Sequence, residues 1–560
     1  MRTYSAERVQ VRVGGVSHST AESPNAHTSR VLDTVILNAH VIDGSGAPWV
    51  RADVGLQDGK IAAIGSLKDA AARTTIDATG KFVAPGFIDS HSHSDWSLLA
   101  NRDCDSTLMQ GVTTEVVGNC GMSYAPVSPL NRERLATDVD RTSPGATIQW
   151  TTFGEYLDHV RQGGIGANYA FLVGHAAVRS SVIGSDERLA APDEIAQMQR
   201  AVAQALEEGA IGFSTGLEFV PGRAASREEL VALSKVVARY GRLHTSHQRT
   251  RNEKFVESVE EILGVCREAG ARLQISHNNK RLGAPDGAWE RTMELQEEAR
   301  RHGLDVSCDT TSYIAGLGLM AAVLPPWLFD AGPAKAAERL GDPVIREKVK
   351  NDCRRYWLMI AERQFDIVWL GRTSNSPEFF GKSFEEIGQL TGQDPMDAYL
   401  DILAKEGAGI ADAGMFGQVK SPDHLRELMQ HPLVALEADA WTASAEGPLA
   451  PLVNHPASFG WTARILGEYV REQKWLRLEE AIKKMTAMPA AKFGLRDRGL
   501  LRPGLAADIV VFDAATIQDN AGFDRPAVYP TGIEHVFVNG RAAVTNGRLN
   551  KVRAGEVLAA

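Results

Sequence analysis

The sequence predicts an α/β fold, a (β/α)8 TIM-like barrel with a small β-sandwich domain built from both chain ends. Three observations favour this fold. In the middle of the chain, short apolar and β-prone runs alternate with helical patterns, as in parallel βα units. Several of these runs end on a side chain that can bind a metal ion. Near both ends, apolar and polar residues alternate between turn signals, which is typical of antiparallel strands.

The length of 560 residues suits a barrel with a second, smaller domain. We expect a mobile tail over residues 1–30, which are rich in Ser, Arg, His and Gly. The sandwich is expected over residues 31–84 and 488–560, and the barrel over 85–487. A turn at Asn539-Gly540 is expected to close a hairpin in the C-terminal part of the sandwich.

The eight barrel strands follow one another along the chain. Their predicted starts lie near Phe87, Thr114, Asn168, Gly209, Arg242, Arg272, Asp305 and Val434. The largest gap separates the last two starts and contains helical stretches such as 334–356. We therefore expect an insertion at about 326–430 that covers the mouth of the active site. Residues 468–485 predict one amphipathic helix packed outside the barrel.

The composition is that of a globular protein, with 44% hydrophobic and 23% charged residues. A net charge of −10 argues against a nucleic-acid partner. Five cysteines do not indicate a disulfide framework. The start carries no secretory signal, and no apolar run is long enough to cross a bilayer. The sequence therefore predicts a cytoplasmic enzyme with no membrane partner.

Two histidines, His91 and His93, directly follow the first predicted strand. Alternate residues of a strand share a face, so both imidazoles are expected to point the same way. Neutral imidazole is the commonest side-chain metal ligand, and one zinc ion can take both rings. The pair alone is a weak signal, and it becomes strong when further ligands arrive at the ends of other strands.

Further metal-competent side chains do end later strands. They are Cys120, His247, His277 and Asp439. In a barrel of this kind the active site lies at the carboxyl ends of the strands and draws on several of them. The six residues together therefore predict one metal centre.

Other residues of these types are interpreted differently. The remaining cysteines are expected to be small buried hydrophobes. His244 lies an odd number of residues from His247, so it should face away from the site. The sequence leaves open whether His175 is structural or supports the site, and whether His455 lies at the barrel mouth or on the surface.

The chain resembles the N-acyl-D-amino-acid deacylase (D-aminoacylase) branch of the amidohydrolase superfamily, from about residue 33 to the C-terminus. The matching motifs lie at 85–93, 111–121, 172–175, 212–217, 274–277, 324–327, 484–486 and 504–513. The Gly-Asn-Cys-Gly element at 118–121 is specific for this branch. Most members of the superfamily bridge two metals with a carboxylated lysine on the fourth strand. Here that strand carries Ser214 and Thr215, so Cys120 is expected to supply the anion.

The chemistry and the resemblance imply the same roles. Cys120, His247 and His277 are expected to hold one tight zinc ion with an open position for water. His91 and His93 would frame a second, weaker position, which Cys120 bridges and Asp439 approaches. Asp439 would take a proton from the water and pass it to the leaving amine.

Two aspartates, Asp89 and Asp95, are candidates for orienting the histidines.

The substrate contacts depart from the family pattern. Relatives usually carry a lysine where this chain has Asn279, and an arginine where it has Ala457. Arginine and lysine are the natural partners of a substrate carboxylate. Arg249 and Lys280 are candidates to replace them. Alternatively, the pocket has become more apolar, with Tyr313 and Trp441 stacking on a bulkier amide.

The leading hypothesis is a zinc-dependent amidohydrolase that cleaves the N-acyl bond of a small-molecule amide, an N-acyl-D-amino acid or an analogue. The second keeps the metal chemistry and changes the substrate to an uncharged aromatic amide, lactam, carbamate or ester. The third is a non-catalytic scaffold relative, and such a protein would be expected to have lost ligands. Homo-oligomer formation is left open.

Overall fold

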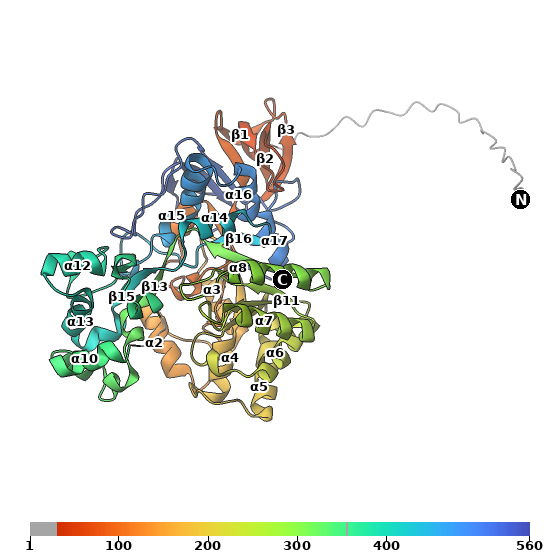
Figure 1. The fold of residues 1–560 in the computed structure, drawn as a ribbon. Helices are drawn as coiled ribbons and strands as arrows, with labels where there is room; N and C mark the ends of the chain where they lie inside the picture. The colour runs from red at the N-terminus through yellow and green to blue at the C-terminus, as the bar shows by residue number, and fades with distance from the viewer. Residues whose placement is uncertain (1–30, 354–356, 560) are drawn as a thin grey trace, which may run out of the picture.

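The structure is a computed structural model that describes residues 31–353 and 357–559. The predicted N-terminal tail lies outside the described residues. The chain forms a barrel, a sheet from the two chain ends and an inserted unit, which Figure 1 shows below and to one side of the end sheet. No helix among the described residues is long and apolar enough to span a membrane.

Eight parallel strands form the barrel, as the sequence predicts. They are β6 (Phe87–Asp89), β7 (Val112–Val117), β8 (Asn168–Gly174), β9 (Gly212–Gly216), β10 (Leu243–His247), β11 (Arg272–Ile275), β12 (Val306–Thr311) and β16 (Val434–Glu437). Each pairs in parallel with the next, in the order of the chain. Every residue of β7 and β8 is buried, because the strands pack against the barrel interior on one face and helices on the other.

The seam of the barrel joins its first and last strands just beyond their carboxyl ends. The amide of Asp439 donates to the carbonyl of His91 over 3.0 Å, and the amide of His93 donates to the carbonyl of Ala440 over 2.7 Å. Ser92 and Ala440 form a parallel bridge at the same place. The seam therefore runs through three of the predicted metal ligands.

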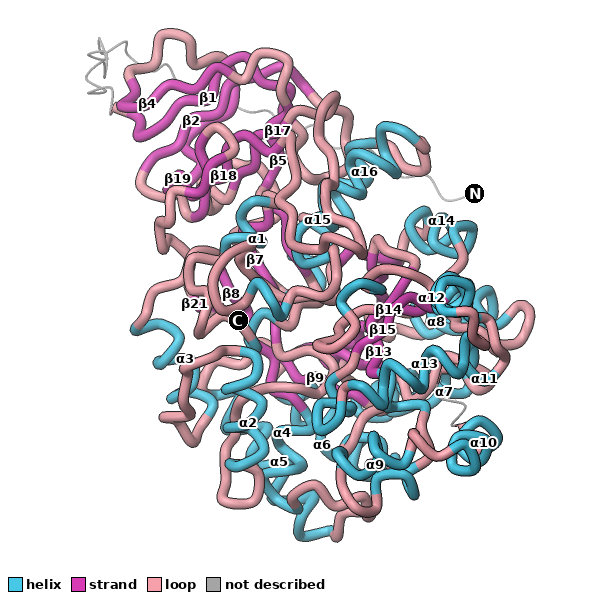
Figure 2. The backbone as a smooth tube through the Cα atoms, turned by 90° about the vertical axis from the view of Figure 1, so that its left-hand side faces the viewer, coloured by secondary structure: helices cyan, strands magenta, loops and turns pink. Residues whose placement is uncertain are grey.

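Helices surround the barrel strands (Figure 2). They include α3 (Phe153–Gln162), α4 (His175–Ile183), α5 (Pro192–Glu207), α6 (Arg227–Arg239), α7 (Phe255–Ala269), α8 (Ala288–Arg301) and α14 (Pro422–Gln430). Local signals define their starts. The hydroxyl of Ser226 accepts from the amide of Glu229 at the start of α6, which satisfies one of the free amides of the first turn. Buried leucine and valine side chains on α6 face the strands.

Both chain ends contribute to a nine-stranded sheet. Its strands are β1 (Leu32–Val41), β2 (Val50–Gln57), β3 (Lys60–Gly65), β4 (Ala72–Asp77), β5 (Phe82–Pro85), β17 (Ile509–Phe512), β18 (Ile533–Val538), β19 (Arg541–Thr545) and β20 (Arg548–Leu549). Strands β5 and β17 pair and thereby join the two ends of the chain. Asn539 and Gly540 both have positive φ in the predicted hairpin turn. The domain boundaries given above stay predictions.

The N-terminal part of this sheet differs from the expected set of antiparallel strands. Strands β4 and β5 both run parallel to β1, which also pairs antiparallel with β2. Alternation of apolar and polar residues reports which face of a strand is buried, and it does not report the direction of its neighbour. The pattern therefore predicts the strands but not this pairing.

The segment between β12 and β16 forms a unit with its own hydrophobic core. Its sheet has the order β13 (Ala315–Leu319), β15 (Gly414–Gln418), β14 (Val368–Leu370), and its helices include α9 (Pro333–Arg339), α10 (Pro343–Asn351), α12 (Phe384–Thr391) and α13 (Pro395–Lys405). The first strand of this sheet starts at Ala315, before the predicted start of the insertion. Helix α14 follows the sheet and precedes β16.

The prediction of a single helix over 468–485 is wrong. A π-helix covers Ile465–Glu472, and α16 (Leu478–Lys484) begins after a break. Lys474 has a positive φ of 56°, and the ring of Trp475 stacks on Tyr469 with 4.6 Å between centroids. The stacking of these two rings thus accompanies a break in the helix, although the apolar residues of this segment recur with the period of a helix.

Candidate metal centre

The structure brings the six predicted ligands together at the carboxyl ends of the barrel strands. His91 and His93 follow β6, Cys120 follows β7, His247 ends β10, His277 follows β11 and Asp439 follows β16. Cys120, His277 and Asp439 have positive φ values of 53°, 32° and 48°. This conformation is uncommon for residues other than glycine, and it concentrates at functional sites. The backbone thus turns sharply at three of the ligands.

One group of donors surrounds the thiol of Cys120. Its Sγ lies 3.6 Å from His247 Nδ1 and 3.5 Å from His277 Nε2. All three side chains are buried. In a tetrahedral zinc site, a sulfur and a nitrogen ligand stand about 3.5 Å apart, given their usual bond lengths. The observed distances fit a zinc ion bound by one thiolate and two imidazoles.

A second group shares the same thiol. His91 Nε2 lies 3.2 Å from Cys120 Sγ and 3.6 Å from Asp439 Oδ1. His93 Nε2 lies 3.3 Å from the same carboxylate oxygen. Nitrogen and oxygen ligands of one tetrahedral ion are separated by about 3.3 Å. The second group therefore also fits a metal position, with Cys120 between the two.

Burial sets the protonation of the histidines. It lowers the pKa of His91 to about 3 and that of His247 to about 4, and it holds the pKa of His277 well below its usual range. These rings are therefore neutral at neutral pH, the form that binds a metal.

The two acidic donors behave differently. Burial, helped by the charge of Asp439, raises the pKa of the Cys120 thiol well above its usual range, so its thiolate needs a nearby positive charge such as a metal ion. Burial alone would raise the pKa of Asp439, but the hydrogen bond from His93 and the neighbouring rings of His91 and His277, which gain a proton only in acid, hold it well below the usual range. The Asp439 side chain keeps 34% of its surface exposed, so substrate and water can reach it.

A carboxylate that sequence reasoning missed supports His247. Glu218 accepts from His247 Nε2 over 2.6 Å, and Arg281 donates to its other oxygen over 2.8 Å. A proton on Nε2 leaves Nδ1 free to face Cys120, so Glu218 fixes the tautomer that the metal position needs. Glu218 lies two residues beyond β9, and no periodicity in the sequence marks it.

Of the two aspartates expected to orient the histidines, Asp89 acts on the backbone instead. Asp89 Oδ1 accepts from the amides of His91 and Ala438, each over 3.1 Å. Asp95 is buried, and burial raises its pKa to about 7. Asp309, which the sequence did not single out, accepts from the amide of His277 and lies 4.0 Å from His91 Nδ1.

Of the four predicted substrate contacts, the structure places only Trp441 at a groove beside the site. Arg249 is held by Glu261 at 2.8 Å and by the carbonyl of Arg223, so it faces α7. The Tyr313 hydroxyl donates to Asp519 over 2.8 Å.

Lys280 contacts His424 through its backbone amide over 3.3 Å. Arg251, which sequence reasoning missed, is buried and donates to the carbonyl of His277 over 3.0 Å and to Asn279 Oδ1 over 3.1 Å. Buried Lys420 was also missed, and it donates to the carbonyl of Thr311 over 2.9 Å.

The other histidines make structural contacts. His244 bonds to Thr215 and Ser234 on the side away from the metal centre, as expected from its register. His175 bonds to buried Glu229 over 2.7 Å. Of the two positions left open for His455, the surface is wrong, since the residue is largely buried and bonds to the carbonyl of Ala315.

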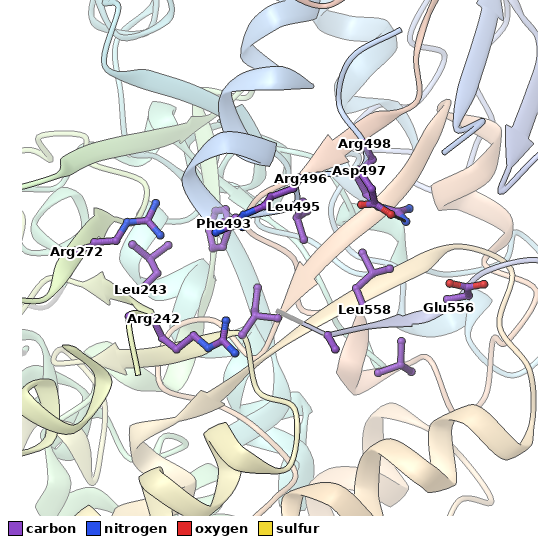
Figure 3. Close-up of a pocket in the computed structure, with 15 residues that line it drawn as sticks. Arg242, Leu243, Arg272, Phe493, Leu495, Arg496, Asp497, Arg498, Glu556 and Leu558 are labelled. Carbon is purple, nitrogen blue, oxygen red and sulfur yellow. Dashed lines mark hydrogen bonds and ion pairs between the residues drawn. The ribbon is translucent and has the colours of Figure 1, made fainter. Parts of the chain in front are cut away.

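A large hollow lies at the opposite end of the barrel strands (Figure 3). It is lined by residues from the starts of β10 and β11 and by segments near the C-terminus, among them Arg242, Arg272, Phe493, Asp497, Arg498 and Leu558. Arg272 pairs with Asp305 and Arg498 with Asp508. This end of a barrel serves stability, whereas chemistry takes place at the other end.

Comparisons with known proteins agree with this geometry. The model of the amidohydrolase family matches residues 74–323 and 385–544. A D-aminoacylase from Alcaligenes xylosoxydans xylosoxydans is 34% identical over 95% of this chain and 98% of its own length. An N-acyl-D-glutamate deacylase from the same organism is 36% identical over 91% and 93%. The chain therefore belongs to the amidohydrolase family.

A solved structure shows which group within this family the chain resembles. The N-acyl-D-glutamate deacylase of Bordetella bronchiseptica, crystallised with zinc and a phosphonate inhibitor, superimposes with a TM-score of 0.76 at 32% identity. The match covers 95% of this chain and all of that one. Within the family, the chain is thus similar to the N-acyl-D-amino-acid deacylases over almost its whole length.

Proposed function

We propose that this protein is a zinc-dependent amidohydrolase that removes the acyl group from N-acyl-D-amino acids. The observation that carries the proposal is the pair of donor groups that share Cys120 Sγ at the mouth of the barrel. The relatives named D-aminoacylase and N-acyl-D-glutamate deacylase supply the substrate class.

The two donor groups would hold the metal as follows. Cys120, His247 and His277 would form the tight site, and His91, His93 and Asp439 would complete a second, weaker position with the shared thiolate. A zinc ion bound there lowers the pKa of a water molecule and polarises the scissile carbonyl.

Asp439 is the group that moves the proton. Its depressed pKa keeps the carboxylate ionised at neutral pH, so it can accept a proton from the attacking water. The same group then delivers that proton to the leaving nitrogen, and the bond between the carbonyl carbon and nitrogen breaks. With only the tight site filled, His93 Nε2, which lies 3.3 Å from Asp439 Oδ1, would hold the carboxylate in place.

The second hypothesis keeps this chemistry on an uncharged amide, lactam, carbamate or ester. The apolar groove beside the site and the loss of basic residues at Asn279 and Ala457 favour it. The complete ligand set argues against a non-catalytic scaffold. A homo-oligomeric state and a cytoplasmic location stay predictions.

The test is amine release from paired N-acetyl-D- and N-acetyl-L-amino acids, with uncharged aryl amides and lactams beside them. We expect cleavage of the D series that a chelator abolishes and added zinc restores. Turnover of the uncharged amides alone would establish the second hypothesis. Well-folded protein with no zinc and no turnover would support the scaffold.

A further inference from the structure

Two arginines join the loops that carry two ligands of the tight site. Arg251 lies in the loop after β10, which ends at His247. Arg281 lies in the loop after β11, a short distance along the chain from His277. The amide of Arg281 donates to the carbonyl of Arg251 over 2.8 Å. The two loops are therefore bonded to each other beside the metal centre.

The side chain of Arg251 reaches across to the second loop. It is buried, and its Nη1 donates to the carbonyl of His277 over 3.0 Å and to Asn279 Oδ1 over 3.1 Å. The amide of Asn279 donates to the same carbonyl of His277 over 2.7 Å. One guanidinium nitrogen thus holds both ends of the tight turn 277–279.

The backbone at His277 depends on such support. Its φ of 32° lies in the left-handed region, which side chains other than glycine adopt only where the surrounding structure enforces it. The amide of His277 donates to Asp309 Oδ1. The turn is therefore held by Asp309 on its amide side and by Arg251 on its carbonyl side.

Arg281 continues the connection to the other histidine. Its Nη1 donates to Glu218 over 2.8 Å, and the second oxygen of Glu218 accepts from His247 Nε2 over 2.6 Å. The rings of His247 and His277 are 4.4 Å apart between centroids. Hydrogen bonds thus run from the carbonyl of His277 through both arginines and Glu218 to the ring of His247, and they join the loops after β9, β10 and β11.

The burial of Arg251 is only partly compensated. Its Nε is buried and has no hydrogen-bond partner among residues 31–353 and 357–559. Burial lowers the pKa of Arg251 to about 10, so the guanidinium stays charged at neutral pH. A buried charge without a full set of partners is destabilising. Departures of this kind concentrate at functional sites, which favours a role for Arg251 in the site.

The contact with Asn279 uses a position at which this chain departs from the family pattern. Relatives usually carry a lysine there, and an ammonium group has no oxygen or lone pair to accept a hydrogen bond. Two cations at this separation would also repel each other. Asn279 instead offers the oxygen to which Arg251 donates, so the two residues form a matched pair in this chain.

We propose that Arg251 is a positioning residue of the metal centre. Its guanidinium fixes the turn that presents His277, with Asn279 as its second acceptor. Through Arg281 and Glu218 it couples that turn to His247, so both imidazoles are held at the spacing that a zinc ion requires. This inference rests on the zinc site of the proposed function.

The first experiment compares the zinc dissociation constants of the parent and Arg251→Lys by competition with a chelator. Lysine keeps the positive charge, so its repulsion of the metal ion is nearly unchanged and only the planar hydrogen-bonding group is lost. We expect the dissociation constant to rise by about 10-fold to 100-fold, the usual effect of removing a group that supports a metal-binding histidine. A rise of less than about twofold would overturn the proposal.

The matched control is Arg102→Lys. Arg102 Nη1 also donates to a backbone carbonyl, that of Val160, over 2.8 Å. Its own carbonyl accepts from the amide of Gly166, which precedes β8 at the end of the barrel away from the metal centre. We expect a lower melting temperature in both variants and weaker zinc binding in Arg251→Lys alone. Equal losses of zinc affinity in the two would show a general effect of stability and overturn the proposal.

The second experiment tests the pair and also serves if Arg251→Lys does not fold. Asn279→Ala removes one acceptor and leaves the guanidinium, and it should raise the zinc dissociation constant by at least about threefold, since a charge-assisted hydrogen bond is lost from the turn. The double variant should match Arg251→Lys within about twofold, because both changes break the same contact. Unchanged zinc binding in Asn279→Ala, or independent effects that multiply in the double variant, would overturn the pairing.

The same measurements separate this inference from the function on which it rests. A folded parent protein that binds no zinc would overturn the proposed function and this inference together. A parent that binds zinc tightly, with the same affinity in Arg251→Lys, would overturn this inference alone.

Discussion

Glu218→Gln should weaken the tight metal position while leaving all of the direct ligands in place. The carboxylate accepts from His247 Nε2 over 2.6 Å, and the opposite nitrogen of that ring lies 3.6 Å from Cys120 Sγ. A neutral amide oxygen can still accept this hydrogen bond, but it loses the part that comes from the negative charge. Such bonds are about twice as strong as bonds between neutral groups.

The magnitude follows from the role of this contact. Removing a carboxylate that orients a metal-binding histidine typically costs about 10-fold to 100-fold in metal affinity, or about 1.4–2.7 kcal/mol. Glu218 is also the partner of Arg281 at 2.8 Å, and the substitution removes the negative charge from this largely buried ion pair, which costs stability. The double variant Glu218→Gln with Arg281→Met separates this cost in stability from the effect on metal binding.

The assay is the zinc dissociation constant, measured by competition with a chelator, together with the melting temperature. Glu261→Gln is the control, because Glu261 on α7 pairs with Arg249 in the same way but contacts none of the metal-binding side chains. We expect weaker zinc binding in Glu218→Gln and in the double variant, and parental binding in the control. Zinc affinity within twofold of the parent in Glu218→Gln would refute the role of Glu218.

Four further outcomes are expected. Cys120→Ser should lose both zinc ions, measured as metal content of the purified protein, because its thiol serves both donor groups; full zinc content would contradict this. Asp439→Asn should keep the tight zinc and lose about 10²–10⁴ in kcat, the usual contribution of a positioned proton-transfer group; near-normal turnover would remove Asp439 as the proton carrier. Gly216→Ala should destabilise the fold and reduce bound zinc, because its Cβ would lie 2.0 Å from the carbonyl oxygen of Cys120; an unchanged melting temperature and zinc content would show that the backbone yields there. Burial lowers the pKa of His244 to about 3, so the unfolded chain binds a proton that the folded chain does not as pH falls below about 6.5. His244 should therefore cost about 3 kcal/mol of stability between pH 7 and pH 4, and His244→Gln should flatten the fall in unfolding free energy over that range; an equally steep fall in the variant would argue against the shift.

The barrel strands could be predicted because they are short, buried, β-prone runs that alternate with helical patterns. Strand β8 is buried along its full length, so its sequence carries no competing polar signal. The predicted starts therefore fall within three residues of the observed ones. The ligands at the strand ends could be placed for the same reason, because the carboxyl ends of parallel strands meet at one face of the barrel.

The contacts behind the ligands could not be predicted in this way. Glu218 lies in a loop whose path depends on tertiary packing. Asp309 lies within β12, and its position in the strand does not show which neighbouring groups it contacts. Arg249 has a spacing from the fifth strand that suits a substrate contact, but its guanidinium is held by Glu261 on the next helix. The groove beside the metal centre could be predicted only in part. Trp441 follows a predicted ligand in the chain, whereas Leu319 and Arg372 come from the inserted unit.

The seam between β6 and β16 has a consequence for how the protein is made. The three ligands of the tight site, Cys120, His247 and His277, all precede residue 278, so a growing chain carries them long before the barrel can close. Asp439 comes some 160 residues later, and its amide docks on the carbonyl of His91 at the seam. Zinc can thus be captured by a barrel of six strands, whereas the proton carrier arrives only with ring closure. The protein therefore gains its proton carrier only when the last barrel strand has joined the first.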